Sequence, residues 1–157
     1  MLDWAEYERW MSQARKTYEL IDADIEYGGY SWACFKAQQA AEFALKALLR
    51  LYGEPGFGHD LPRLYERAKS LCPVEPREEV ERCVYLLDKM YIPSRYPDAF
   101  TEGAPWEHYT RVEALEAKRC AATVIEWVES CARAVKEAEG VGGGPRAAEE
   151  VGGEAPR

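Results

Sequence analysis

The chain has 157 residues, of which 47% are hydrophobic and 31% charged, and its formal net charge is −8. These values are typical of one globular domain with a real core, and they exclude a chain that is disordered throughout. No apolar run approaches the roughly 18 residues of a membrane-spanning helix, and the acidic start MLDWAEYERW is unlike an export signal, so we expect a cytoplasmic protein without a membrane partner. Because the net charge repels nucleic acid, any RNA contact needs a local cluster of arginine or lysine.

Two long helices are predicted at the start of the chain. Asp3 and Glu6 form a capping-box pattern, and apolar residues then recur at three- and four-residue spacing, which predicts an amphipathic helix over residues 4–27. A Gly-Gly pair ends this helix, and Ser31 can cap a second helix over residues 31–52. Two long helices joined by so tight a turn are expected to pack as an αα-hairpin.

Two shorter helices are predicted in the middle of the chain. Asp60 can cap a short helix over residues 61–71, after a loop that contains three glycines. Pro76 suits the first position of the next helix, which is expected to end near Tyr91. The segment 92–109 contains several prolines and many aromatic residues, so we expect an ordered, packed loop that is not helical throughout.

The last predicted element is a long helix. Thr110 and Glu113 form a second capping box, and the apolar pattern continues to about Ala138. Residues 139–157 are rich in glycine and are expected to form a disordered tail, so the folded domain is predicted to cover residues 1–138. No strand pattern or internal repeat is visible. The sequence therefore predicts an all-α fold, an up-down bundle of four main helices with one short extra helix.

The cysteines do not form a metal-binding pattern. They are Cys34, Cys72, Cys83, Cys120 and Cys131. No C-x-x-C pair is present and the chain has only two histidines, so no zinc site is expected and the favoured interpretation is buried free thiols. The absence of asparagine and the scarcity of glutamine resemble a thermophile's avoidance of thermolabile side chains. Since hyperthermophiles carry intracellular disulfides, that alternative stays open.

A stripe of polar residues runs along the second predicted helix and is interrupted by two large apolar residues. On a helical wheel this polar stripe consists of Phe35, Gln38, Gln39, Glu42, Lys46 and Leu49. Large apolar groups among polar ones indicate a surface that another protein segment covers, either a loop of the same chain or a second subunit. The alternative for Glu42 and Lys46 alone is an ordinary i,i+4 pair on an exposed helix.

Three stretches of the sequence together resemble the HEPN domain family. They are AQQAAEFALKALL in the second helix, GHDLPRLYERA at the start of the third, and YIPSRYPDAF after the fourth, and the similarity covers roughly residues 4–136. The resemblance implies a bundle of four or five helices that usually forms a homodimer. Many stand-alone members are encoded beside a minimal nucleotidyltransferase, with which they pair in systems of toxin–antitoxin character, and many others are ribonucleases.

The ribonuclease members carry an arginine, then four to six residues, then a histidine, near the dimer cleft. This sequence departs from that pattern, because no arginine stands at that distance before His59 or His108. Arg95 lies near where the family places its arginine, but His108 follows it only after twelve further residues. Such an enzyme needs proton carriers and a cation, so Arg95 can serve only if folding or dimerisation brings a histidine close. The structural interpretation is that both histidines belong to helix-entry turns, His59 with its ring bonded to local backbone.

Arg95 also has two interpretations. It stands between two prolines in a restrained segment, where it can form an internal ion pair with Asp98 or Glu42. Alternatively, its guanidinium binds a phosphate or a partner's carboxylate in bidentate fashion. Tyr96 and Asp98, beside it, join the polar stripe as candidate contact residues.

The sequence contains no phosphate-binding loop, nucleophile elbow or metal-binding pair, and no cofactor is expected. It predicts a dimeric, catalytically weak or silent binding partner of a minimal nucleotidyltransferase in a toxin–antitoxin-like two-protein system. One alternative is a divergent, metal-independent ribonuclease toxin that uses Arg95 and a histidine, with His59 as the other catalytic candidate. Another is a non-enzymatic bundle that binds a nucleotide or acts as a scaffold.

Overall fold

The computed structural model describes residues 1–142, and within them the only regular elements are helices. They are α1 (Trp4–Glu26), α2 (Tyr30–Leu51), α3 (Leu61–Leu71), α4 (Glu78–Asp88), a 3₁₀ turn (Pro97–Ala99), α5 (Pro105–His108) and α6 (Arg111–Gly142). The predicted all-α bundle is confirmed for this part of the chain. None of these helices combines the length and the apolar character needed to cross a membrane.

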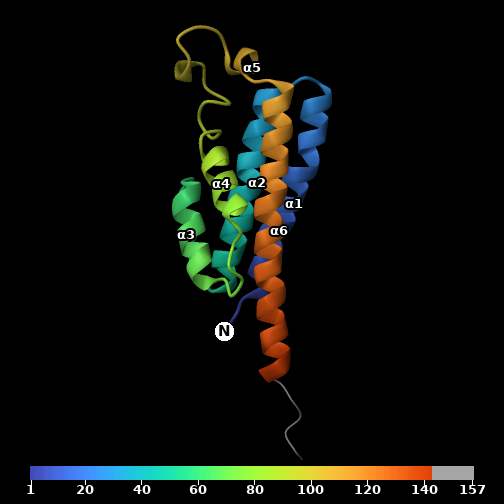
Figure 1. Cartoon of the computed structure of the whole chain (residues 1–157), viewed down its shortest axis with the longest axis vertical. Coiled ribbons are helices and arrows are strands. Elements are labelled where there is room, and N and C mark those ends of the chain that lie inside the picture. Colours follow the sequence, from blue (N-terminus) through green and yellow to red (C-terminus); the bar gives the residue numbers. More distant parts are fainter. Residues whose placement is uncertain (143–157) are drawn as a thin grey trace, which may run out of the picture.

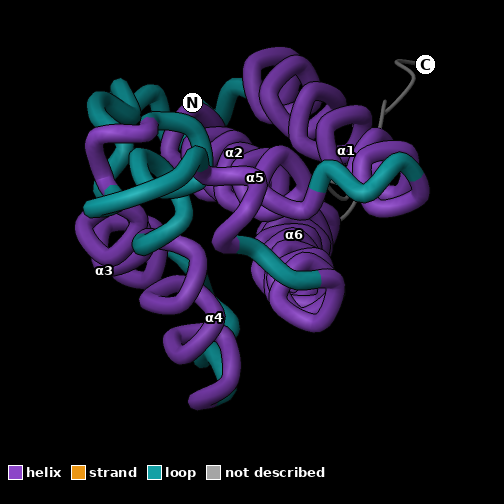
Figure 2. Tube along the Cα trace, turned by 90° about the horizontal axis from the view of Figure 1, so that it is seen from above, coloured by secondary structure: helices purple, strands orange, loops and turns teal. Residues whose placement is uncertain are grey.

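Helix α2 lies at the centre of the bundle. It packs against α1 in the predicted αα-hairpin and against α6 along much of its length, while α3 and α4 cover another side (Figure 1). Seen from above, α1, α6 and the α3–α4 pair surround α2 (Figure 2). A helix enclosed in this way can keep few residues in water, which accounts for the burial of its polar side chains described below.

Alanine is the side chain that lets the neighbouring helices approach α2. Six alanines of this helix are fully buried: Ala33, Ala37, Ala40, Ala41, Ala44 and Ala47. Larger buried side chains of the other helices, such as Met11 and Ile21 of α1 and Val124 and Val128 of α6, fill the space that these small residues leave.

Three of the four predicted side-chain caps are confirmed, and Ser31 is the exception. An Oδ1 atom of Asp3 accepts a hydrogen bond from the backbone of α1 at 3.0 Å, and Asp60 does the same for α3 at 3.1 Å. Thr110 and Glu113 form the reciprocal pair before α6, at 3.3 and 3.2 Å. Each of these bonds satisfies a backbone N–H that has no partner inside its own helix.

The predicted start of the second helix is wrong. Helix α2 begins at Tyr30 with Gly29 as its N-cap, no side chain caps it, and Ser31 is buried in the first turn. Gly28 has a φ angle of 76°, and the chain turns at this residue. Ser31 therefore already lies inside the first turn of α2, two residues past Gly29, the position from which a side chain could cap it.

Helix α4 is shorter than predicted at both ends. It begins at Glu78, after Arg77 as N-cap, and ends at Asp88. Pro76 therefore precedes the helix. At the other end, Ile92 stands before Pro93, a position that disfavours helical backbone, and Tyr91 lies outside the helix.

The helices of the bundle differ in length. Helices α3 and α4 have 11 residues each, whereas α1, α2 and α6 have 23, 22 and 32. The segment 92–109 contains the 3₁₀ turn and α5, as expected of a packed loop. Helix α6 continues to Gly142, a few residues past the end predicted near Ala138. The rest of the predicted tail lies outside the described residues.

Four of the five cysteines form disulfides, so the expectation of free thiols is wrong for them. Cys72 pairs with Cys131 and Cys83 with Cys120, at Cα separations of 5.3 and 4.9 Å, while Cys34 stays free and buried. Both bonds attach α6 to the α3–α4 unit. Among the described residues no group of histidine, cysteine and acidic side chains is arranged to hold a metal ion.

Candidate functional site

The polar stripe is covered by the chain's own loop between α2 and α3. The side chains of Gln38, Glu42, Lys46 and Leu49 are buried, and Glu42 and Lys46 are therefore not an exposed surface pair. A Cβ atom at Gly56 of that loop would lie 2.7 Å from Cγ of Lys46, which shows how closely the loop backbone approaches the stripe.

Glu42 is the centre of a buried hydrogen-bond network. Its Oε2 atom accepts from Nζ of Lys46 at 3.1 Å, and its Oε1 atom accepts from Nε2 of Gln38 at 3.3 Å. Gln39 donates to Gln38 at 2.7 Å and so extends the network to the margin of the helix. Oε1 of Glu42 also lies 2.9 Å from Nδ1 of His59. A buried carboxylate is tolerated when its charge and lone pairs are matched in this way.

His59 is held by this network and by an aromatic ring. A carboxylate paired with lysine can only accept, so Nδ1 of His59 carries the proton and the other ring nitrogen, Nε2, keeps its lone pair in the neutral imidazole. The imidazole stacks on Tyr91 with 4.4 Å between ring centroids, and half of the side chain is exposed. The predicted bond of His59 to local backbone is therefore replaced by a bond to the buried stripe.

Arg95 is held by its own chain through a carbonyl and three rings. Its Nε and Nη2 atoms donate to the carbonyl oxygen of Tyr91 at 3.0 and 2.9 Å. Its Cζ atom lies 4.0 Å from the ring centroid of Phe35, 4.6 Å from that of Tyr91 and 4.9 Å from that of Tyr96. Within residues 1–142 it forms no ion pair with Asp98, which is exposed in the 3₁₀ turn, or with Glu42. The rings thus take the place of the predicted carboxylate.

The side chains around Arg95 form a partly exposed surface that we call the Arg95 platform. It consists of Trp32, Phe35, Tyr91, Arg95 and Tyr96. Trp32 contacts Phe35 edge to face, and Trp32 and Tyr96 are each about half exposed. The sequence candidates did not include Tyr91 or Trp32. The four-residue spacing of Tyr91 and Arg95 was the available signal for the first, and the position of Trp32 beside the polar stripe was the signal for the second.

The two sequence-predicted catalytic candidates meet at Tyr91. The ring of this residue contacts the imidazole of His59 and the guanidinium of Arg95. A cavity of about 480 Å³ adjoins the stack and is lined by His59, Asp60, Asp88, Lys89, Tyr91, Ile92 and Pro93. Folding of one chain therefore places His59 and Arg95 against the same aromatic ring, that of Tyr91.

His108 lies elsewhere. Its Nε2 atom is 2.7 Å from the carbonyl oxygen of Glu102, and its ring stacks on Phe100 with 4.1 Å between centroids. It is the last residue of α5, three positions before α6 begins at Arg111. Both contacts are made within the segment 92–109 and hold its second half together.

The model of the HEPN domain family matches residues 7–131 of this sequence. The chain belongs to the HEPN domain family.

Three solved structures agree with this assignment. TT1696 from Thermus thermophilus is 40% identical, with a TM-score of 0.75, over 79% of this chain and 96% of that one. ST0689, described as an archaeal HEPN homologue, is 38% identical, with a TM-score of 0.65, over 79% and 95%. The HEPN domain protein TM0613 from Thermotoga maritima is 32% identical, with a TM-score of 0.60, over 78% and 95%. No protein of curated function matches the sequence.

Proposed function

We propose that this HEPN-domain protein is the dimeric binding component of a toxin–antitoxin-like two-protein system, paired with a minimal nucleotidyltransferase and catalytically silent by itself. One observation carries the proposal. The guanidinium of Arg95, the cation that a ribonuclease of this family would need, is already engaged by a carbonyl and three aromatic rings. Because these contacts fix the guanidinium, it is better suited to contact a partner protein than to bind a phosphate whose position changes during a reaction.

The exposed parts of the Arg95 platform support a protein-binding role. Trp32 and Tyr96 present aromatic surface around an arginine, and Ile92 nearby in the sequence is 55% exposed. Tryptophan, tyrosine and arginine are the residues that most often contribute large shares of binding energy at protein interfaces. Trp32 stands on α2, and Arg95 and Tyr96 lie between Pro93 and Pro97, so the backbone that carries these side chains is restrained before binding, which reduces the entropy cost of association.

A ribonuclease is the second candidate, and the contact of His59 with Tyr91 favours it. Glu42 orients the imidazole and leaves Nε2 as a proton acceptor, and Arg95 lies on the same tyrosine ring. A ribonuclease requires a histidine close to Arg95, and the shared contact with Tyr91 supports such an arrangement. For catalysis Arg95 would have to turn at least one N–H toward a phosphate beside the histidine.

The first proposal predicts a minimal nucleotidyltransferase gene beside this one, and co-expression of the two proteins tests it. We expect the two proteins to purify together, and we expect Arg95→Ala and Tyr96→Ala to weaken the complex. Arg63→Ala is the matched control, because Arg63 is exposed on α3 and its side chain has no ion-pair partner in the described part of the chain. Failure of the wild-type pair to associate, or equal weakening by Arg63→Ala, contradicts this role of the platform.

Incubation with mixed RNA separates the two candidates. The first predicts no cleavage by the wild-type protein. Cleavage that disappears in both His59→Ala and Arg95→Ala, and persists in His108→Ala, would overturn it and establish the ribonuclease.

Light scattering tests the predicted homodimer. The buried members of the polar stripe are covered by their own chain, and Phe35 belongs to the Arg95 platform. A self-contact that leaves the platform to the partner must therefore use Gln39, with Phe43 beside it. We expect a dimer at micromolar concentration and a shift toward monomer in Phe43→Glu. A wild-type monomer under these conditions contradicts the prediction.

A further inference from the structure

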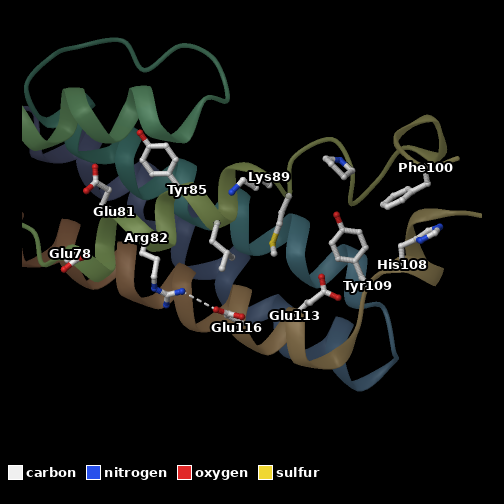
Figure 3. Close-up of a pocket in the computed structure, with 13 residues that line it drawn as sticks. Glu78, Glu81, Arg82, Tyr85, Lys89, Phe100, His108, Tyr109, Glu113 and Glu116 are labelled. Carbon is white, nitrogen blue, oxygen red and sulfur yellow. Dashed lines mark hydrogen bonds and ion pairs between the residues drawn. The ribbon is translucent and has the colours of Figure 1, made fainter.

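A long groove runs between α4 and α6, outside the Arg95 platform and the polar stripe. Its volume is about 890 Å³, larger than that of the cavity beside His59. The segment that carries Phe100, His108 and Tyr109 closes one end (Figure 3). Since α4 rises about 1.5 Å per residue, the wall from Glu78 to Lys89 is about 16 Å long.

Apolar and aromatic side chains line the groove between its ends. Tyr85, Leu86, Met90 and Pro93 contribute to this surface, and about half of Tyr85 is exposed. Burial of such surface by a ligand stabilises a complex by roughly 25 cal/mol per Å² before the costs of association. The groove therefore offers affinity for apolar groups along its centre.

The charge of the groove is negative and unevenly placed. Four carboxylates line it, from Glu78, Glu81, Glu113 and Glu116, against the two cations Arg82 and Lys89. Arg82 pairs with Glu116 at 3.4 Å near the middle, as the dashed line in Figure 3 shows. Within the described residues Glu78 and Glu81, at one end, have no ion-pair partner, and Glu113, at the other, is bonded only to the helix-capping threonine.

We propose that this groove is a docking site for an extended segment of a partner protein that carries lysine or arginine on each side of apolar residues. The carboxylates toward the two ends would bind the basic side chains, and the aromatic centre would bind the apolar ones. An extended segment advances about 3.3 Å per residue, so about five residues span the groove. RNA is disfavoured by the carboxylates, and a small molecule would stay largely exposed in so open a groove. The proposal does not depend on the partner being a nucleotidyltransferase.

Binding of labelled peptides to the full chain tests the charge requirement. The probe is the capped peptide KLFLAK. Its matched controls are ELFLAE, with the charges reversed, and KSGSAK, in which serine and glycine replace the two leucines and the phenylalanine. We expect saturable binding of KLFLAK at one site per chain and at least tenfold weaker binding of each control, as for loss of one close charge pair or of the apolar contact. Absence of saturable binding, or equal binding of all three peptides, overturns the proposal.

Two variants and a control locate the site. Glu81→Lys places a cation at the unpaired end and Tyr85→Ala removes aromatic surface, and each should weaken KLFLAK binding about tenfold. Glu26→Lys makes the same change of net charge at an exposed position of α1, and it should leave binding unchanged. Equal weakening by Glu26→Lys would identify attraction to the whole acidic protein and contradict a groove. Circular dichroism of each variant verifies the fold. A photo-crosslinker at the peptide phenylalanine should label only the segments that line the groove, residues 78–93, 100 and 108–116.

Discussion

Oε1 of Glu42 lies 2.9 Å from Nδ1 of His59, across 17 positions of the sequence. This contact joins the centre of α2 to the loop that precedes α3, and the stack of His59 on Tyr91 extends the connection to the Arg95 platform. The buried polar stripe and the exposed platform are therefore parts of one connected arrangement. Substitutions in the buried polar stripe are therefore expected to alter the Arg95 platform.

Removal of the Glu42 carboxylate should strongly destabilise the protein. Glu42→Ala leaves Lys46, whose side chain is 9% exposed, without its counter-charge, and breaking a buried pair in this way costs about 3–5 kcal/mol. The double change Glu42→Leu with Lys46→Met removes both charges and should recover most of that loss. Denaturant unfolding measures each free energy.

The control for Glu42 is a surface pair. Glu19→Gln, which removes the exposed partner of Lys16, should change the free energy of unfolding by about 0.5 kcal/mol or less. Equal effects of Glu42→Ala and Glu19→Gln would show that the buried network contributes no more than a surface contact.

Addition of a methyl group at Gly56 should loosen the loop that covers the polar stripe. A Cβ atom there meets Cγ and Cβ of Lys46 at 2.7 and 3.3 Å, on the buried stem of the side chain. We expect Gly56→Ala to lower the free energy of unfolding by about 1–3 kcal/mol, the usual range for overpacking. Gly140→Ala, at an exposed position near the end of α6 where no atom lies within 4 Å of the new Cβ, should be neutral or slightly stabilising. The opposite order of the two variants contradicts the close approach at Gly56.

Arg95 should hold the backbone of the segment that follows α4. The amides of Arg95 and Tyr96 donate to the carbonyl of Ile92, and the guanidinium binds the carbonyl of Tyr91. In Arg95→Ala we expect faster hydrogen exchange at residues 95–100, with α2 unchanged. Lysine cannot reproduce the planar, two-pronged contact, so Arg95→Lys should rescue exchange only in part. Unchanged exchange in Arg95→Ala, or the same change in Arg63→Ala, would rule out this role.

The two disulfides should make stability depend on the redox state. They join residues 59 and 37 positions apart, and each such bond typically stabilises a domain by about 2–4 kcal/mol. Alkylation of the unfolded, unreduced protein should modify one thiol, that of Cys34. Dithiothreitol should lower the Tm of the wild type and of Cys34→Ala equally, and it should affect Cys131→Ser less. Five reactive thiols in the unreduced protein would contradict the pairing.

Acid should remove one set of contacts between α4 and α6. Hydrogen bonds and charge from Arg119, followed by Arg82, lower the pKa of Glu79 from its ordinary 4.5. A lowered folded-state pKa means that stabilisation is present above about pH 4.5 and is lost as the pH falls through the folded value. The Tm difference between wild type and Glu79→Gln should therefore be constant near neutral pH, vanish in acid and shrink in high salt. A difference that grows below pH 4.5 contradicts this assignment.

Predictions from the sequence were accurate for interactions between residues close together in the chain and failed for contacts between distant ones. Capping by Asp3, Asp60 and Thr110 involves residues within one turn, so the pattern identified these helix starts correctly. Ser31 failed as a cap because the conformation of Gly28, and not the presence of a serine, decides where α2 starts. Both Arg95 and His59 were identifiable as candidates, whereas their common contact with Tyr91 was not.

The amino-acid pattern alone determined the helical class, the approximate helix ranges, the family and the polar stripe on α2. Only the tertiary structure decided that the chain's own loop covers the stripe, that Arg95 rests on aromatic rings, and that four cysteines pair. The physical reason is that helix periodicity and caps depend on neighbours three or four positions away. The pairing of Glu42 with His59 or of Cys72 with Cys131 depends on how packed helices place residues that are distant in the sequence.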